Sequence, residues 1–315
     1  MILIFSISTD VTTDFVVMRL KTKYIRINTD IDDVQTSIEL CNQKKTIWFK
    51  LNNGDFKFKL NDIKKIWYRR GHIMKDVPYD SFSNMFNFYF HTNVDTIRNF
   101  ISRRTELKTL GSYSHEMHVN KLLNIHRASD AGILVPPTLI TSHKEEVQTF
   151  LALHKKIIIK PIKHPFSILF RDEIITPSSG IMLFDNLNEF SELFPLTLFQ
   201  KYIEKKFELR IFFIGDEFFT AAIFSQSHED SKIDYRDGNP RIVRMVPFKL
   251  SEHIVKKLVE FRNSVGLNTG SIDMIIDPND DYYFLEVNPS GQFLGLSQNC
   301  NYKLTDRIAR FLDSE

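Results

Sequence analysis

The feature that most constrains the fold of this chain is a turn, DPNDD at Asp277–Asp281, between two runs of strand-forming residues. Proline and Asx residues supply the φ values and the local hydrogen bonds that a tight turn requires. The two flanking runs therefore predict an antiparallel hairpin. Residues equally far from the centre of the turn lie opposite each other, which pairs Asp273 with Glu286.

Side chains alternate between the two faces of a strand, so the hairpin can be sorted into faces directly from the sequence. In each strand, one face is predicted to be apolar and to pack in a core. The expected faces are Ile272, Met274 and Ile276 against Ser271, Asp273 and Ile275 in the first strand, and Tyr283, Leu285 and Val287 against Tyr282, Phe284, Glu286 and Asn288 in the second.

The second face collects two carboxylates and a carboxamide at one end of the hairpin, those of Asp273, Glu286 and Asn288. Adjacent carboxylates repel each other and raise each other's pKa unless a positive charge lies between them. Carboxylate and carboxamide oxygens are the hard ligands that Mg²⁺ prefers. From this pattern alone, a magnesium site and a solvated polar face without an ion are both open.

Length and composition indicate a globular protein of two or three domains, since 315 residues exceed one small core. The formal charge of +2 argues against a dedicated nucleic-acid binder. The two cysteines are too few for a disulfide framework, and no apolar run approaches the roughly 20 residues of a membrane span. We therefore expect a cytoplasmic protein with neither nucleic acid nor a membrane as its partner.

The order of the elements indicates an α/β (α+β) fold in three parts. Short apolar runs predict a first α/β domain over residues 1–107, which closes with a helix-rich stretch at 81–104. A central part over 108–197 and a C-terminal part over 198–315 follow. The elements expected in these two parts are helices at 121–131, 144–153, 187–194 and 251–265, and strands at 157–160, 197–203, 208–214, 217–224, 271–276 and 282–288.

Several charged residues upstream of the hairpin are candidates for binding an anion. Lys160 ends a β-branched run, where its ammonium group suits a phosphate or lies in solvent. Glu208 and Arg210 alternate on one strand face, as a structural ion pair or as part of a site. Arg236 and Arg244 lie in or beside a polar loop. The sequence contains neither a P-loop nor a GxGxxG motif.

Taken in order, these segments resemble the ATP-grasp ligases, and more narrowly the graspetide (microviridin-type) peptide maturases of the grasp-with-spasm group. The resemblance implies an ATP-grasp fold: an N-terminal pre-ATP-grasp α/β domain, a small central domain and a C-terminal antiparallel-sheet domain. The segments that carry it are WYRR, NKLLNIHRASDAGILVPPTLIT, IIIKPI, FQKYIEKKFELRIFFIGDEFFTAAIFSQ, DYR, NPRIVRMVPFKL, LNTGSIDMIID, YYFLEVNPSGQF and CNY.

The resemblance also implies a role for each candidate residue. Two lysines contact the nucleotide phosphates, a linker binds adenine, and one acid holds the ribose hydroxyls. Three arginines lie near the transferring phosphate, and the acidic end of the hairpin binds Mg²⁺. In that order the residues are Lys121 and Lys160; Gln200, Lys201, Tyr202 and Ile203; Glu208; Arg210, Arg236 and Arg244; and Asp273, Glu286 and Asn288.

In this family the enzyme uses Mg·ATP to convert side-chain carboxylates of a precursor peptide to acyl phosphates. A Ser, Thr or Lys side chain of the same peptide then closes an ester or amide ring. The expected partners are therefore the leader and core of a precursor peptide, and a homodimer is implied. A RimK-like ligase that adds amino acids, and a catalytically silent nucleotide-binding regulator, are the alternatives. The loop at 164–180 has one glycine, fewer than many ATP-grasp phosphate loops.

Overall fold

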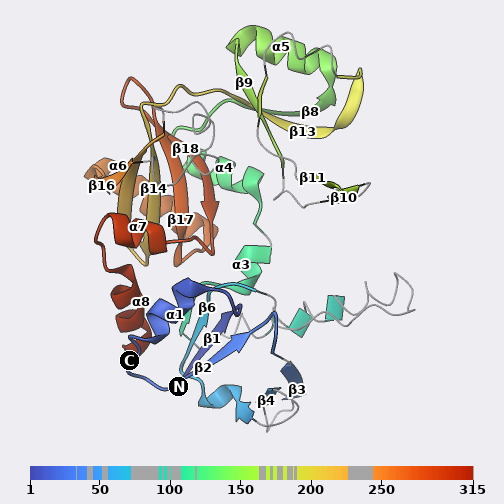
Figure 1. The fold of residues 1–315 in the computed structure, drawn as a ribbon. Coiled ribbons are helices and arrows are strands. Elements are labelled where there is room, and N and C mark those ends of the chain that lie inside the picture. Colours follow the sequence, from blue (N-terminus) through green and yellow to red (C-terminus); the bar gives the residue numbers. More distant parts are fainter. Residues whose placement is uncertain are drawn as a thin grey trace.

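The structure is a computed structural model, and the residues that it describes form five sheets and their flanking helices (Figure 1). Three of these sheets have four or five strands, and they follow one another along the chain. The described residues are 1–32, 34–40, 45–51, 56–71, 92–93, 96–97, 100, 108–117, 119–162, 168–170, 173–175, 180–182, 187, 190–225 and 244–314.

The first sheet is parallel and has the strand order β2-β1-β6-β7. Every residue of its central strand β1 is buried, as expected for a parallel strand covered on both faces. The strands predicted from the short apolar runs are confirmed, whereas the helix-rich stretch at 81–104 lies mostly outside the described residues. The bounds are β1 (Ile2–Ser6), α1 (Val11–Val17), β2 (Tyr24–Asn28), β3 (Val34–Leu40), β4 (Lys45–Leu51), β5 (Phe56–Lys59), β6 (Lys65–Tyr68) and β7 (Lys108–Leu110).

The central sheet has the order β12-β9-β13-β8, and α5 packs against it through Val147 and Leu151. The helix predicted at 187–194 is wrong at its end, because Leu193 already pairs with His143 in the sheet. Phe194 packs there against Phe190 and Phe199. The bounds are β8 (Thr138–His143), α5 (Lys144–His154), β9 (Ile157–Lys160), β10 (Ile168–Phe170), β11 (Glu173–Ile175), β12 (Gly180–Met182) and β13 (Leu193–Lys201).

The C-terminal sheet is antiparallel and has the order β16-β15-β14-β17-β18. Gly215 and Asp216 form the turn between β14 and β15, the first two strands of this sheet along the chain, as the strands expected at 208–214 and 217–224 predict. The predicted polar loop at 227–241 lies outside the described residues. The bounds are α3 (Tyr113–Met117), α4 (Lys121–Asp130), β14 (Phe207–Ile214), β15 (Glu217–Phe224), β16 (Arg244–Phe248), α6 (Glu252–Val265), β17 (Thr269–Ile276), β18 (Tyr282–Asn288), α7 (Leu294–Asn299) and α8 (Leu304–Asp313).

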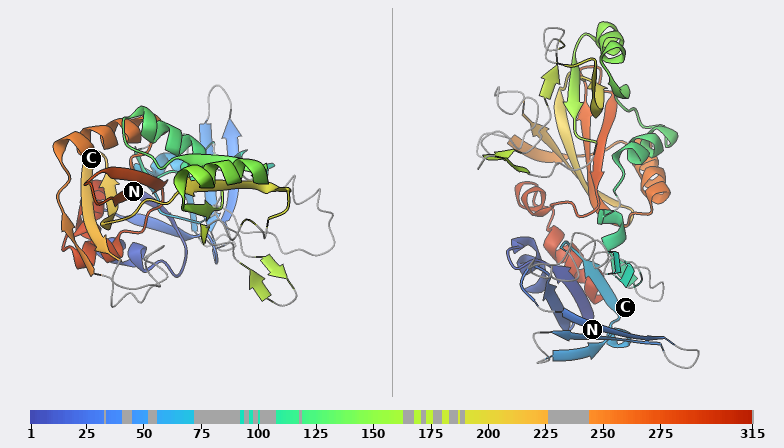
Figure 2. Two further views of the ribbon diagram at one scale, coloured as in Figure 1. Left: turned by 90° about the horizontal axis from the view of Figure 1, so that it is seen from above. Right: turned by 90° about the vertical axis from the view of Figure 1, so that its right-hand side faces the viewer.

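Two of the described helices, α4 and α6, cover one face of the upper part of this sheet (Figures 1 and 2). Residues such as Leu209, Ile272 and Phe284 form a core with α4 and α6. Two caps fix the ends of α6: Ser251 accepts a hydrogen bond from the backbone of Ile254, and Gly266 takes the left-handed conformation. The charged residues of β14, β17 and β18 lie on the face opposite these two helices.

The last two helices connect the C-terminal sheet to the first sheet. α8 lies beside α1, and the two ends of the chain lie side by side (Figures 1 and 2). Leu304 and Ile308 of α8 share one core with Ile4 of β1 and Phe212 of β14. None of the described helices is long and apolar enough to cross a membrane.

Candidate functional site

The acidic ends of the last hairpin are paired as the sequence predicts. Asp273 of β17 lies opposite Glu286 of β18, and Ser271 lies opposite Asn288. On its other side, Asp273 lies opposite Arg210 of β14. Because opposed residues of antiparallel strands share a face, Arg210, Asp273 and Glu286 form one charged row across three neighbouring strands, on the face opposite α4 and α6.

A β-bulge interrupts the hairpin next to this row. The register shifts between Asp273 and Met274, and Leu285 has no partner on the opposite strand. As a result Phe284 faces Met274 and joins the same buried core as Val287. The prediction that Phe284 shares the face of Glu286 is therefore wrong. One extra residue changes the phase of the alternation, and such bulges often re-aim a side chain beside a functional site.

Each acid of the charged row has a cation beside it. Arg210 donates from Nη1 to both oxygens of Asp273, at 2.7 and 2.6 Å. Nζ of Lys121, the first residue of α4, lies 3.8 Å from Oε2 of Glu286 and donates to the carbonyl of Pro161 at 3.2 Å. Lys121 thus bridges the C-terminal hairpin and the end of β9 in the central sheet.

Lys160 and Gln200 lie side by side on neighbouring strands of the central sheet. Nζ of Lys160 donates to Oε1 of Gln200 at 2.9 Å, and Nε2 of Gln200 donates to the hydroxyl of Thr138 at 3.0 Å. Gln200 is buried, and these bonds fix the orientation of its amide. The structure thereby brings together the side chains of two predicted nucleotide contacts, Lys160 and Gln200.

The segment after Gln200 connects the central sheet to the C-terminal sheet. The backbone N–H of Lys201 donates to Pro137, and that of Tyr202 donates to Lys156. The ammonium group of Lys156 lies 3.9 Å from the ring centroid of Tyr202, whereas the side chain of Ile203 is buried. The residues predicted to hold adenine therefore form the strand end and connector between the two sheets.

Glu208 is a buried carboxylate with its own cation. Lys205 donates to Oε1 of Glu208 at 2.7 Å, and Ser225 donates to the same oxygen at 2.8 Å. Burial raises the pKa of Glu208, and Lys205 and Ser225 partly offset this rise. The sequence left open an ion pair between Glu208 and Arg210. The structure pairs Glu208 with Lys205 and Arg210 with Asp273 instead.

One of the predicted arginines, Arg244, is not brought to the charged row, and another, Arg236, lies outside the described residues. Arg244 begins the edge strand β16 and is exposed. Arg244 lies on the same face of the sheet as Val246 and Phe248, because the three residues are two positions apart along β16. Val246 and Phe248 pack on the face opposite Arg210.

The charged row offers a chemically suitable donor set for Mg²⁺. Asp273 and Glu286 carry hard oxygens and lie opposite each other, and Asn288 adds a carboxamide nearby. A carboxylate has about four lone-pair positions, so an arginine bonded to it leaves room for a metal ion. The described residues contain no group of three or more acidic, histidine or cysteine side chains placed to hold a metal ion. The residues present fit a cation shared with a ligand such as a phosphate.

Several residues of this region were not predicted from the sequence. Lys205 supports Glu208, and Thr138 orients Gln200. Arg69, from the WYRR segment, contacts the residues that follow Asn288. The spacing of Lys205 and Glu208 was visible in QKYIEKKFE, but the other two partners come from distant segments and leave no local pattern.

Comparisons with known families agree with this geometry. The model of the RimK-like ATP-grasp domain matches residues 118–312, and that of the MvdD pre-ATP grasp domain matches residues 1–126. The first match covers more than half of the chain. The chain belongs to the RimK-like ATP-grasp family, and its mixed α/β fold is that of an ATP-grasp ligase.

Two solved structures show what this member of the family is similar to. A RiPP-associated ATP-grasp ligase of Chryseobacterium gregarium, in complex with ADP and a leader and core peptide, is 26% identical, with a TM-score of 0.84 over 99% of this chain and 95% of that chain. The macrocyclase MdnC of Microcystis aeruginosa MRC, bound with precursor peptide MdnA, is 28% identical. Its TM-score is 0.82, over 99% of this chain and 98% of that chain.

A third structure supports the fold alone. The macrocyclase MdnB of Microcystis aeruginosa MRC is 21% identical, with a TM-score of 0.75 over 99% of this chain and 98% of that chain. The search of curated proteins found no match.

Proposed function

We propose that the chain is an ATP- and Mg²⁺-dependent macrocyclase of a ribosomally made precursor peptide. A side-chain carboxylate of the peptide attacks the γ-phosphorus of ATP, which releases ADP and forms an acyl phosphate. A hydroxyl or amine of the same peptide then attacks the acyl carbon. Phosphate leaves, a proton is lost, and an ester or amide ring closes.

The observation that carries this proposal is the position of Lys121. Its ammonium group lies between Glu286 of the C-terminal hairpin and the carbonyl of Pro161, next to Lys160. Two lysines and the acidic ends of a hairpin thus converge from two sheets, which is the arrangement that a metal-bound polyphosphate requires. Lysine contributes a compact charge suited to phosphate.

The other candidate residues are assigned to adenine, to the ribose and to Mg²⁺. We assign the adenine contacts to the connector from Gln200 to Ile203 and the ribose hydroxyls to Glu208. Asp273, Glu286 and Asn288 would hold Mg²⁺, which supplies positive charge that offsets the charge developing on the transferring phosphate. Arg210 donates to Asp273 and therefore lies beside the proposed Mg²⁺ site. The assignment of Arg236 to the same site depends on the family resemblance alone, and the resemblance also names Arg244, which lies on the face opposite Arg210.

The peptide substrate is supported by the two similar structures, whose proteins were solved with precursor or leader and core peptides. Both likenesses extend over 99% of this chain. We propose the same division into three domains, 1–107, 108–197 and 198–315, with the nucleotide between the last two. We also propose a homodimer in the cytoplasm, where ATP is available.

The test is incubation of the protein with Mg·ATP and the precursor peptide encoded beside its gene, followed by mass spectrometry. Each ring closed through an ester or amide removes the mass of one water from the peptide and consumes one ATP. Loss of one or more waters, with an equal amount of ADP formed, is the expected result. An unchanged peptide mass would refute the macrocyclase.

The same experiment decides against a second candidate. Residues 118–312 match the model of the RimK-like ATP-grasp domain. A RimK-like ligase, which adds free amino acids to a carboxylate, is therefore the second candidate. With an amino acid mixture present, that reaction raises the mass of the acceptor by one residue at a time. Ring closure lowers the mass of the peptide, so the sign of the change separates the two reactions.

A further inference from the structure

The segment that follows the last strand, Pro289–Phe293, fixes the side chain of Asn288. Oδ1 of Asn288 accepts a hydrogen bond from the backbone N–H of Ser290 at 3.0 Å, which forms an Asx turn. The N–H of Gly291 donates to the carbonyl of Asn288 at 3.2 Å. A β-carbon at position 291 would overlap the side chain of Ser271, so only glycine fits against β17 there. The orientation of Asn288 therefore depends on where this segment lies.

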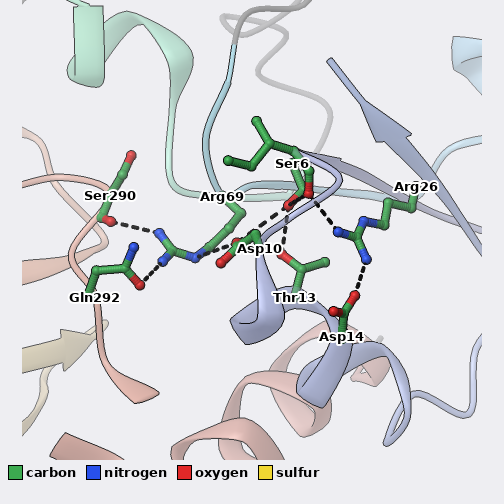
Figure 3. Close-up of polar contacts among 9 residues, drawn as sticks. Ser6, Asp10, Thr13, Asp14, Arg26, Arg69, Ser290 and Gln292 are labelled. Carbon is green, nitrogen blue, oxygen red and sulfur yellow. Dashed lines mark hydrogen bonds and ion pairs between the residues drawn. The ribbon is translucent and has the colours of Figure 1, made fainter. Parts of the chain in front are cut away.

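Arg69, the residue directly after β6 of the first sheet, holds this segment in place (Figure 3). Nη1 of Arg69 donates to the carbonyl of Ser290 at 2.7 Å, and Nη2 donates to Oε1 of Gln292 at 2.6 Å. The guanidinium carbon also lies 5.9 Å from the ring centroid of Phe293. The planar fork of arginine makes two directed bonds at once, which lysine cannot reproduce.

The opposite side of Arg69 is anchored within the N-terminal region. Nε of Arg69 lies 3.3 Å from Oδ2 of Asp10, and the two side chains are only 3% and 4% exposed. Thr13 donates to the same oxygen of Asp10 at 2.8 Å (Figure 3). Burial lowers the pKa of Arg69 to about 10, which leaves the guanidinium charged at neutral pH.

Stability alone does not account for this arrangement. A buried ion pair costs about as much to desolvate as it gains, and apolar residues of similar volume often stabilise a protein equally well. The pair instead fixes one geometry, because both oxygens that accept from Arg69 belong to the segment that orients Asn288. Groups that orient a metal ligand without touching the metal commonly change metal affinity.

We propose that Arg69 is a positioning residue that acts through Ser290 and Gln292 on Asn288, so that the N-terminal region sets the affinity of the site for Mg²⁺. The inference rests on the proposed function, which makes Asn288 a ligand of Mg²⁺. It goes beyond that function because Arg69 is not among the residues assigned to the metal or the nucleotide, and it follows β6 of the first sheet, whereas the assigned ligands lie in the C-terminal sheet.

The test measures how much Mg²⁺ is required for half-maximal binding of a fluorescent ATP analogue. Arg69→Lys keeps the charge beside Asp10 but loses the fork, and Gln292→Met removes one acceptor from an exposed side chain. We expect Arg69→Lys to raise the required Mg²⁺ concentration roughly 10-fold, the lower end of the effect of outer-shell changes. Gln292→Met should shift the Mg²⁺ requirement in the same direction by less.

Two further variants separate positioning from a merely structural role. Arg26→Lys changes an arginine of the same sheet that pairs with Asp14 and does not touch the segment after Asn288, so its Mg²⁺ requirement should equal that of the wild type (Figure 3). In an Asn288→Ala background, Arg69→Lys should have no additional effect on the Mg²⁺ requirement, because the residue through which it acts is absent.

Three results would overturn the inference. The first is an unchanged Mg²⁺ requirement in Arg69→Lys, and the second is an equal further loss in the Asn288→Ala background. If Arg69→Lys does not fold, an unchanged requirement in Gln292→Met is the third. Failure of the proposed function would differ from all of these, since the wild-type protein itself would then show no Mg²⁺-dependent binding of the nucleotide.

Discussion

At the scale of single residues, the candidate site is built from carboxylates whose cations are already in place. Lys205 and Glu208 are almost fully buried as a pair, and Arg210 and Asp273 are nearly so. Removing one partner of such a pair leaves an uncompensated charge and typically costs about 3–5 kcal/mol. The pairs therefore fix charged groups in position before any nucleotide binds, which is the form of preorganisation that phosphoryl transfer uses.

The pH dependence of nucleotide binding reports on Glu208. Burial raises the pKa of Glu208 above the ordinary value of 4.5, and a protonated carboxyl group is a poorer acceptor for ribose hydroxyls. We expect ADP to bind with its highest affinity at neutral pH, where Glu208 is ionised. As the pH is lowered, the affinity should begin to fall while the pH is still above 4.5. Isothermal titration calorimetry across this range measures the decline.

The control for this prediction is Glu208→Gln, which should bind ADP more weakly at neutral pH and lack the decline. A wild-type affinity that stays constant down to pH 4.5 would contradict the assignment of Glu208. The same decline in the glutamine variant would also contradict it.

Lys121 is the residue whose removal should weaken ATP binding most directly. A hydrogen bond to a charged group contributes about 1.5–3 kcal/mol, so Lys121→Gln should raise the KM for ATP roughly 10- to 100-fold. Lys144→Gln is the matched control, because Lys144 also begins a helix but, among the described residues, has an ion pair only with the exposed Glu192. Steady-state kinetics of ADP formation compares the two, and an equal KM in both variants would refute the role of Lys121.

At the scale of elements, local sequence patterns predicted most strands and the pairing of Asp273 with Glu286. Alternation failed at Phe284, since the extra residue Leu285 shifts the phase and nothing in YYFLEVN marks a bulge. The helix predicted at 187–194 failed for a related reason. Phe194 is half-buried in an aromatic cluster with Phe190 and Phe199, and this tertiary packing overrides the local helix pattern.

The N-terminal cap of α4 should matter for function as well as for stability. Asn120 accepts a hydrogen bond from the backbone of Leu123, and Lys121 is the first residue after this cap. Asn120→Ala should lower the free energy of unfolding by about 1 kcal/mol and loosen the turn that holds Lys121. The KM for ATP should therefore rise together with the loss of stability.

Ser251→Ala provides the comparison, because it removes the equivalent cap of α6, away from the charged row. This variant should lose a similar free energy of unfolding, again about 1 kcal/mol, and should keep the wild-type KM for ATP. Urea denaturation and steady-state kinetics give the two quantities. A rise in KM that is the same for both variants would mean that α4 has no special role.

At the scale of the whole molecule, one apolar core joins the two ends of the chain. Ile308 of α8 packs with Ile4 of β1 and Phe212 of β14, although these residues are far apart in the sequence. Arg69 and Ser290 also make contact in this region, although they are 221 positions apart in the sequence. Contacts of this length leave no periodic signal, which is why composition and alternation could indicate each region but not how the regions meet.

This shared core predicts that damage to α8 reaches the first sheet. Ile308→Ala should lower the free energy of unfolding by about 2–5 kcal/mol and increase hydrogen exchange in β1. Leu151→Ala removes an equally buried residue from the central core, which does not include β1. Leu151→Ala should leave hydrogen exchange in β1 unchanged. Faster exchange in β1 in both variants, or in neither, would contradict the role of the core that α8 shares with β1.

The central claim is that the acidic end of the last hairpin holds Mg·ATP for ring closure. Its most direct test is the mass of the precursor peptide after incubation with Mg·ATP and the Glu286→Gln variant, beside the wild-type protein. Glutamine keeps the size of Glu286 but removes the charge, so the fold should persist, as circular dichroism would check. We predict that the wild-type protein removes one or more waters from the peptide and that Glu286→Gln leaves its mass unchanged. Full loss of water in the variant would contradict the site.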